Sequence, residues 1–329
     1  QADMVVLAIG VTPDTVLAKE ASLELGIKES IVVNDRMETS VPDIYAAGDA
    51  VQVKHYVTGN DALISLAGPA NKQGRIIADN ICGGDSRYLG SQGSSVIKVF
   101  DMTAATTGIN ETNAKKSGLE VDTVILSPMS HAGYYPGGKV MTMKVIFEKE
   151  SYRLLGTQII GYEGVDKRID VLATAIHAGL NATQLKDLDL AYAPPYSSAK
   201  DPVNMAGFMI DNIAKGTLKQ WHLEDMDKIS KDKDVVLLDV RTVGEFSRGH
   251  IDGFKNIPVD ELRERISEIE KGKPVYLICQ SGLRSYIASR ILEGNGYETY
   301  NFSGGFRFYD AVVNDRALIE RAYACGMDY

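Results

Sequence analysis

A short apolar run, a tight loop and a helical pattern follow one another in the segment Val275-Tyr-Leu-Ile-Cys279-Gln-Ser-Gly282-Leu-Arg284-Ser285. The run from Val275 to Cys279 has the length and apolar character of a buried strand, and the pattern of Leu283 to Asn295 is that of a helix. In an open parallel sheet, chemistry is concentrated at the carboxyl ends of the strands. The segment therefore predicts a strand, loop and helix that present one cysteine, Cys279, at the edge of a sheet.

Strand and helix patterns alternate on both sides of this segment. The further patterns are a strand at Val235 to Val240, an amphipathic helix at Val259 to Ile269 and a strand at Thr299 to Phe302. Such alternation at short spacing predicts right-handed crossovers and a parallel sheet covered on both faces. We assign residues 214–329 to this α/β domain and take the polar stretch Ala214 to Lys219 as the linker before it.

The loop after Cys279 has the composition of an anion site. Gly282 permits a sharp turn that directs backbone N–H groups inward, and the following helix presents its positive end. Such a cradle favours the thiolate, which is the form that attacks a sulfur donor. Arg284 adds a planar cation suited to an oxyanion such as thiosulfate or to a persulfide. The alternative is that Cys279 is a small apolar residue that closes a core strand.

The motif CxxGxRS at Cys279 has two upstream companions, Leu238-Asp239-Val240-Arg241 and Glu245-Phe-x-x-Gly-His250-Ile-x-x-Phe-x-x-Ile-Pro258. Together they resemble the rhodanese homology domain over about Trp221 to Tyr329. The resemblance implies that Cys279 carries a transferable persulfide sulfur, that Asp239 and Arg241 support the fold around the loop, and that His250 is structural rather than a base.

The sequence of the N-terminal third predicts an α/β structure. We expect a buried strand at Ala2 to Gly10, a second strand that ends in Ile44-Tyr-Ala-Ala-Gly48-Asp49-Ala50, and a helical pattern at Ile64 to Ile81. The small residues before Asp49 let a large ligand approach the backbone, and Asp49 can accept a hydrogen bond from a sugar-like hydroxyl. Taken alone, a Gly-Asp pair at a strand end is a turn.

Two companion motifs, Ala8-Ile-Gly-x-x-Pro13-Asp14 and Ser65-Leu-Ala-Gly-Pro-Ala-Asn-Lys-Gln-Gly-Arg75, make residues 1–93 resemble the C-terminal half of the FAD domain in pyridine nucleotide-disulfide oxidoreductases. The resemblance implies that Asp49 binds the flavin ribityl chain and that the later helix directs its N-terminus at the pyrimidine end of the ring. It assigns four residues to FAD binding: Gly48, Asp49, Leu66 and Ala67.

The family's two GxGxxG fingerprints and its flavin-proximal redox cysteine have no counterpart in the sequence, which begins with Gln1. We therefore expect either the C-terminal part of a longer protein or a chain that has lost flavin chemistry.

The middle region, residues 94–213, reads as an α+β domain with β-branched strands between Ser95 and Phe147, a helix at Asn110 to Ser117, a strand at Leu154 to Gly161 and a helix at Val165 to Gly179. The stretches around Ser130 to Gly138 and Leu190 to Asn204 resemble the dimerisation domain of coenzyme A-disulfide reductases. The resemblance implies that Tyr134 and Tyr192 reach the partner subunit's flavin site and stabilise a thiolate or protonate a leaving sulfur. The alternative for both tyrosines is interface packing.

The composition of the chain limits the classes of partner that we expect it to bind. With 35 Lys+Arg against 44 Asp+Glu the net charge is −9, and no basic block stands out, so we expect no nucleic acid partner. The apolar runs are too short to cross a bilayer, and we expect a soluble, cytoplasmic protein without a membrane partner. Three cysteines without CxxC or CxxH spacing predict neither a disulfide framework nor a metal site.

The sequence thus predicts an α/β and α+β multidomain chain: a partial FAD/NAD(P)-binding Rossmann-like domain, a dimerisation domain and a rhodanese domain. By resemblance its function is the FAD- and NAD(P)H-dependent reduction of coenzyme A disulfide, coenzyme A persulfide or polysulfide in a homodimer, coupled to sulfur transfer through Cys279. One alternative is a stand-alone sulfurtransferase with a non-catalytic flavoprotein-like scaffold, and a second is a non-enzymatic dimerisation and sulfur-relay module.

Overall fold

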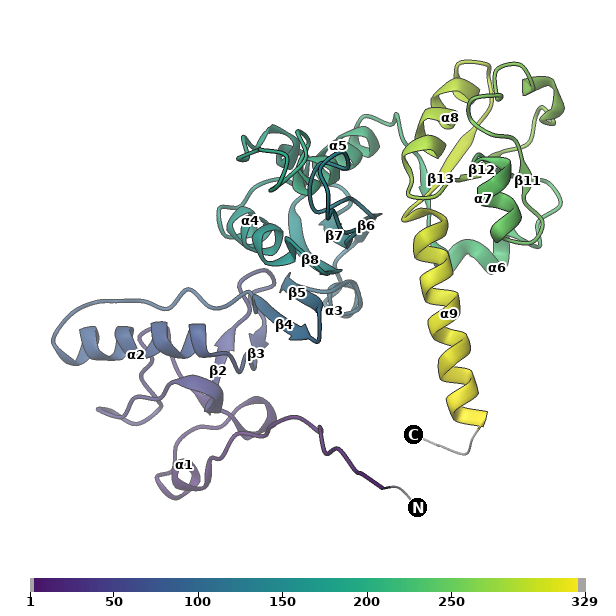
Figure 1. The fold of residues 1–329 in the computed structure, drawn as a ribbon. Coiled ribbons are helices and arrows are strands. Elements are labelled where there is room, and N and C mark those ends of the chain that lie inside the picture. Colours follow the sequence, from purple (N-terminus) through teal and green to yellow (C-terminus); the bar gives the residue numbers. More distant parts are fainter. Residues whose placement is uncertain (1–2, 325–329) are drawn as a thin grey trace. The chain divides into compact units, whose positions relative to one another are not determined.

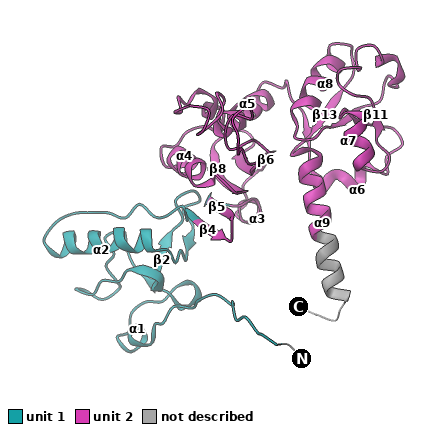
Figure 2. Cartoon of the chain, viewed as in Figure 1, with its two compact units in different colours: residues 1–95, 107–109 teal, residues 96–106, 110–329 magenta. Residues whose placement is uncertain are grey.

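The computed structural model describes residues 3–324, with side chains described as far as residue 315. Cys325 and the outermost ends of the predicted first and last domains therefore lie outside the described residues. The chain divides into two compact units, residues 1–95 with 107–109, and residues 96–106 with 110–329 (Figure 2). Among residues 3–324, no helix has both the length and the apolar character that a bilayer span requires.

The first unit is built on a small sheet in which β1 pairs with β2 in parallel and β2 pairs with β3 antiparallel. Met37, Val51 and Val53 form its buried centre, and the long helix predicted from the sequence is confirmed as α2 (Figure 1). The elements are α1 (Val16–Glu20), the 3-10 turn η1 (Ile27–Glu29), β1 (Ile31–Val32), η2 (Gly48–Ala50), β2 (Val51–Lys54), β3 (Asp61–Ala62) and α2 (Ala67–Ile81).

Two predictions for this unit are wrong. Residues 4–10 form no strand, and Val5, Leu7 and Ile9 are 79 to 85% exposed. A strand needs a neighbour for its backbone N–H and C=O groups, and no described strand pairs with this segment. The strand expected before Gly48 is reduced to a single bridge between Glu38 and Tyr45.

The first half of the second unit is an α+β layer, as predicted. Its five-stranded sheet has the order β4-β5-β8-β7-β6, with β7 antiparallel to both β6 and β8. Apolar residues of α4, including Ile169 and Leu172, are buried together with sheet residues such as Val145 and Leu155. The elements are β4 (Ser95–Val99), β5 (Met102–Gly108), α3 (Glu111–Lys116), β6 (Val121–Leu126), β7 (Thr142–Glu148), β8 (Leu154–Gly161), α4 (Val165–His177), η3 (Ala182–Asp187) and α5 (Pro202–Ala214).

The second half is the predicted parallel sheet. Five strands in the order β11-β10-β12-β13-β9 pair in parallel throughout. Successive residues of β12 enter two different cores, Leu277 in one and Ile278 in the other, so both faces are covered as predicted. The elements are β9 (Gln220–Trp221), η4 (Leu223–Asp225), α6 (Met226–Ile229), β10 (Val236–Asp239), α7 (Val243–Arg248), β11 (Lys255–Asn256), η5 (Ile266–Glu268), β12 (Val275–Ile278), α8 (Leu283–Glu293), β13 (Thr299–Phe302) and α9 (Gly305–Ala324).

The amphipathic helix predicted at Val259 to Ile269 is wrong. The segment consists of turns and the short η5, and most of its backbone hydrogen bonds span three residues rather than four. Leu262 and Ile269 are buried in the core, so the apolar positions of this segment face inward as expected, but its backbone forms turns in place of an α-helix. The hydroxyl of Tyr297 lies 3.2 and 3.0 Å from the carbonyl oxygens of Ile266 and Ile269 and shares its single hydrogen between them, which stabilises these turns from the core side.

Tyr297→Phe tests this account. It should destabilise the parallel-sheet domain by about 1 to 2 kcal/mol, because the one donor shared by the two carbonyl groups is lost. Trp221, the single tryptophan of the chain, is buried in this domain, so its fluorescence during urea unfolding reports the loss. Tyr300→Phe is the matched control, since its hydroxyl contacts the exposed Glu298. Equal midpoints for the two variants would contradict the role of Tyr297.

Candidate functional site

Cys279 follows directly on β12, and its side chain is 1% exposed. Its Sγ lies 3.1 Å from the backbone nitrogen of Gly282 and 3.1 Å from Ser285 Oγ, and both donate to it. Gly282 has φ +100°, a conformation that side chains disfavour, and it is the N-cap of α8. Two hydrogen-bond donors and the positive end of a helix therefore meet at one sulfur, which is an arrangement that stabilises a thiolate.

The backbone of the loop after Cys279 is held in place by the first residues of α9. The backbone nitrogens of Phe306 and Arg307 donate to the carbonyl oxygens of Cys279 and Gln280, at 2.8 and 3.1 Å. Gly305 allows this approach, because a Cβ added there would lie 2.7 Å from the backbone nitrogen of Ser281. The conformation of the loop thus depends on contacts from both sides.

Arg284 forms a two-pronged ion pair with Glu245 of α7, with both N–O distances 2.7 Å. The hydrogen bonds from Arg284 lower the pKa of Glu245 to about 2 from its ordinary 4.5. A carboxyl whose pKa is lowered on folding stabilises the fold above its ordinary pKa, and this contribution is lost as the pH falls toward 2. Because Glu245 already binds the guanidinium, the predicted contact of Arg284 with a substrate anion stays a prediction.

A buried ion pair lies next to the loop that follows Cys279. Arg241 donates to Asp239 at 2.7 Å, and both side chains are 1% exposed. Arg241 also donates to the carbonyl oxygen of Gly249 at 2.8 Å and lies 3.8 Å from the ring centre of Phe306. These contacts agree with the supporting role expected for the pair. The ring of His250 stacks on Phe246 at 4.0 Å, and this contact favours a structural role for the histidine.

Tyr134 and Tyr192 are brought together although they are 58 residues apart, with their hydroxyl oxygens 2.6 Å from each other. Tyr134 is 77% exposed and Tyr192 is 44% exposed. The hydrogen bond to Tyr134 raises the pKa of Tyr192. One hydroxyl proton is used between the rings, and the other is available to a ligand.

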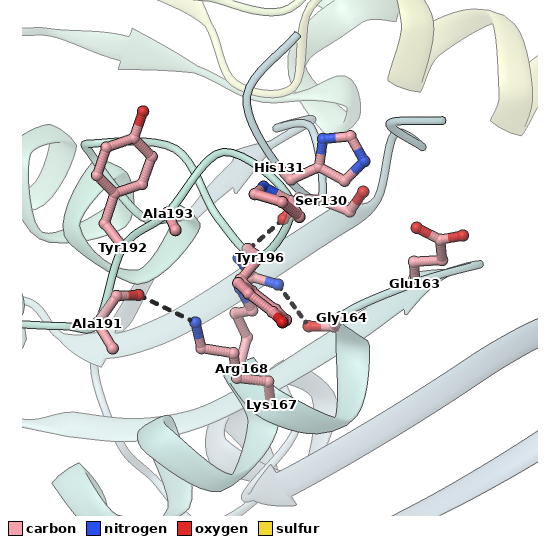
Figure 3. Close-up of a pocket in the computed structure, with 11 residues that line it drawn as sticks. Ser130, His131, Glu163, Gly164, Lys167, Arg168, Ala191, Tyr192, Ala193 and Tyr196 are labelled. Atoms are coloured by element: carbon pink, nitrogen blue, oxygen red, sulfur yellow. Dashed lines mark hydrogen bonds between the residues drawn. The ribbon is translucent and has the colours of Figure 1, made fainter. Parts of the chain in front are cut away.

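A pocket of about 600 Å³ lies beside Tyr192, and Figure 3 shows the residues around it. The buried Arg168 donates to Asp201 at 2.9 Å and to Ser197 Oγ at 3.1 Å. It also donates to the carbonyl oxygen of Ser130 at 2.9 Å. Arg168 lies on α4 and Asp201 caps α5, so this network holds the loops that carry both tyrosines.

The four residues assigned to FAD lie within the first unit around the start of α2. Gly48 has φ +83°, and its backbone nitrogen donates to Gln73 of α2 at 2.7 Å. The carboxylate of Asp49 is exposed and has no hydrogen-bond partner among the described residues. Leu66 is the N-cap of α2 without a side-chain cap, and Ala67 is the first helical residue. A free carboxylate next to an uncapped helix N-terminus fits a ligand with hydroxyl groups and an anionic ring edge.

The predicted residues therefore fall into three groups: Cys279 with Arg284, Tyr134 with Tyr192, and the four around α2. Among the described residues, no hydrogen bond or ion pair joins the tyrosines to the cysteine loop. Sequence reasoning missed Ser285 as a donor to sulfur, although it belongs to the quoted motif. It also missed Glu245 as the partner of Arg284, although the capping box of Thr242 and Glu245 at the start of α7 could have drawn attention to it.

Three protein-family models match the chain. Residues 1–74 match the model of the pyridine nucleotide-disulphide oxidoreductases, residues 94–202 match the dimerisation domain of the same family, and residues 222–311 match the rhodanese-like domain.

Curated relatives agree with these matches. The chain is 37% identical over 203 residues to the NAD(P)H sulfur oxidoreductase (CoA-dependent) of Pyrococcus abyssi, a match that covers 62% of this chain and 45% of that protein. It is 35% identical over 207 residues to a coenzyme A disulfide reductase of Staphylococcus aureus, which covers 63% of this chain and 47% of that protein. The matches span about half the length of these relatives.

Two solved structures resemble most of the chain. The structure of reduced Bacillus anthracis CoADR-RHD superposes with a TM-score of 0.93 at 48% identity, covering 96% of this chain and 57% of that one. An NAD-dependent persulfide reductase from A. fulgidus superposes with a TM-score of 0.86 at 42% identity, covering 94% and 56%. The likeness thus extends over the dimerisation and rhodanese-like regions together.

The cysteine loop predicts the effect of Ser285→Ala. Loss of one donor to a charged sulfur should lower kcat/KM for thiosulfate:cyanide sulfur transfer about tenfold. Ser289→Ala is the matched control, because Ser289 is also buried on α8 but donates to the carbonyl oxygen of Tyr286. If both variants transfer sulfur equally well, the hydroxyl of Ser285 does not act on Cys279.

Proposed function

Because the chain belongs to the pyridine nucleotide-disulphide oxidoreductase family and also carries a rhodanese-like domain, we propose that it acts in the reduction of coenzyme A disulfide, coenzyme A persulfide or polysulfide. The reduction depends on FAD and NAD(P)H and is coupled to sulfur transfer through Cys279. The observation that carries the proposal is the sulfur of Cys279, held by two donors at a helix N-terminus.

The sulfur-transfer step follows from the cysteine loop. The thiolate of Cys279 attacks the outer sulfur of a persulfide R–S–SH, the bond between the two sulfurs breaks, and the pair of electrons leaves with R–S⁻. Cys279 then holds the transferred sulfur as Cys–S–SH, with no net oxidation or reduction. Ser285 Oγ lies 3.1 Å from both Cys279 Sγ and the carbonyl oxygen of Gly282, so its single hydrogen can turn to the sulfur when that sulfur is charged.

The flavin site fits the first unit. Asp49 would accept a hydrogen bond from a ribityl hydroxyl, and the N-terminus of α2 at Leu66 and Ala67 would face the pyrimidine edge of the ring. When bound, FAD supplies the electrons that it takes from NAD(P)H for the reduction of substrate sulfur. Both NADH and NADPH stay compatible with the proposal.

We assign the pair of Tyr134 and Tyr192 to the reduction of the disulfide or persulfide substrate. One hydroxyl orients the other, and the free proton is donated to the thiolate that leaves when a disulfide or persulfide is reduced. The exposure of Tyr134 supports a role at a surface that a second subunit reaches, in a homodimer built through the dimerisation domain.

We place this homodimer in the cytoplasm, where it acts on small thiols, disulfides and persulfides. Cys82 and Cys279 are both free, which is typical of a reducing compartment. The alternative of a stand-alone sulfurtransferase on an inert scaffold has less support, because the oxidoreductase models match both regions before the rhodanese-like domain. The two relatives described above are named as a sulfur oxidoreductase and a coenzyme A disulfide reductase.

Cys279→Ser should abolish thiosulfate:cyanide sulfur transfer while the domain stays folded, because a hydroxyl cannot carry a persulfide sulfur. Steady-state assays measure the activity, and Trp221 fluorescence verifies the fold. Transfer near the normal rate would overturn the assignment of Cys279. Cys82→Ser is the control, since this exposed cysteine lies in the other unit.

Replacing both Tyr134 and Tyr192 by Phe tests their role in the reduction of the disulfide substrate. The rings and their packing stay, but the proton donors are lost, so turnover of coenzyme A disulfide by the complete flavoprotein should fall by about 10² to 10⁴. Sulfur transfer at Cys279 should be retained. A double variant that reduces coenzyme A disulfide at the normal rate would make the tyrosines interface packing. Sedimentation of the variant checks that dimerisation survives, and single replacements separate the two hydroxyls if it does not.

A further inference from the structure

A cavity of about 320 Å³ lies beside the cysteine loop, between α7 and the first turns of α9. Gln280, the residue after Cys279, forms part of its wall together with Phe306. The cavity therefore adjoins the backbone that carries the nucleophile. Thiosulfate, a small dianion, needs no such volume next to the loop, whereas a thiol compound with a longer tail does.

The charges of this cavity are not balanced. Two of its charged residues are bound elsewhere, Arg241 to Asp239 and Glu245 to Arg284. Two further arginines that line it, Arg248 and Arg307, have no hydrogen bond or ion pair from their guanidinium groups to any described residue.

Asp310 contributes the one remaining carboxylate of the lining, so two positive charges face one negative charge. This local excess of positive charge is found on a chain of net charge −9. Such a site attracts an anion against the charge of the whole molecule.

We infer that Arg248 and Arg307 bind the anionic tail of the persulfide that delivers sulfur to Cys279. The inference rests on the proposed function and adds to it the chemical class of the donor, a persulfide whose tail carries phosphate or carboxylate groups. A guanidinium offers planar paired donors that match both groups. The tail is held in the cavity between α7 and α9, and the outer sulfur reaches the loop at Cys279.

The test compares three donors with different tails: coenzyme A persulfide with phosphates, glutathione persulfide with carboxylates, and 2-mercaptoethanol persulfide with an uncharged tail. Each is assayed as sulfur donor to the full chain and to the variants Arg248→Gln, Arg307→Gln and the double variant. The measured quantity is kcat/KM for a charged-tail donor divided by kcat/KM for the uncharged donor.

This ratio should fall about tenfold for each arginine removed, the loss typical of a charge-assisted hydrogen bond. The donor whose ratio falls most identifies phosphate or carboxylate as the group that is bound. Asp310→Asn should change the ratio in the opposite direction, because it removes the competing carboxylate.

Arg265→Gln is the matched control, since this arginine of the same domain is paired with Glu261 and Glu268 and does not line the cavity. An unchanged ratio in the double variant, with normal Trp221 fluorescence, would overturn the inference while Cys279 keeps its role. Failure of the proposed function has a different signature, which is sulfur transfer that survives in Cys279→Ser.

Discussion

The parallel register of β10 against β12 is the constraint on which the cysteine site depends. Asp239 is paired with Ile278 in this register, so the residues that follow both strands emerge side by side. The buried pair of Asp239 and Arg241 thereby lies against the loop that begins at Cys279. A slip of one residue would exchange the two faces of the strand and move the cysteine out of its core.

Buried ion pairs have the same role in both halves of the second unit. Arg241 with Asp239 supports the cysteine loop, and Arg168 with Asp201 supports the loops of the two tyrosines. Removal of one partner from such a pair leaves an uncompensated buried charge, which costs about 3 to 5 kcal/mol. Each pair therefore fixes a loop that carries residues of the candidate site.

Three residues predicted for the candidate site have a different property, which is capacity for a further contact. Tyr134 and Tyr192 have one proton more than their mutual hydrogen bond uses, and Asp49 has no partner among the described residues. These three residues thus differ from the two buried ion pairs, whose charged groups are satisfied within the chain. Arg284 differs from Arg248 and Arg307 in the same way, because its guanidinium is already paired with Glu245.

Sequence by itself determined the order of strands and helices around Cys279, the long helix α2 and the alternation that buries both faces of the parallel sheet, because these features depend on local spacing of apolar residues. It failed at residues 4–10 and at Val259 to Ile269, where neighbours rather than local spacing decide the backbone. Only the tertiary structure decided which distant residues meet. Glu245 reaches Arg284 across 39 positions, and Tyr134 reaches Tyr192 across 58. Such pairs arise where separate elements pack together, and no periodicity along the chain encodes that packing.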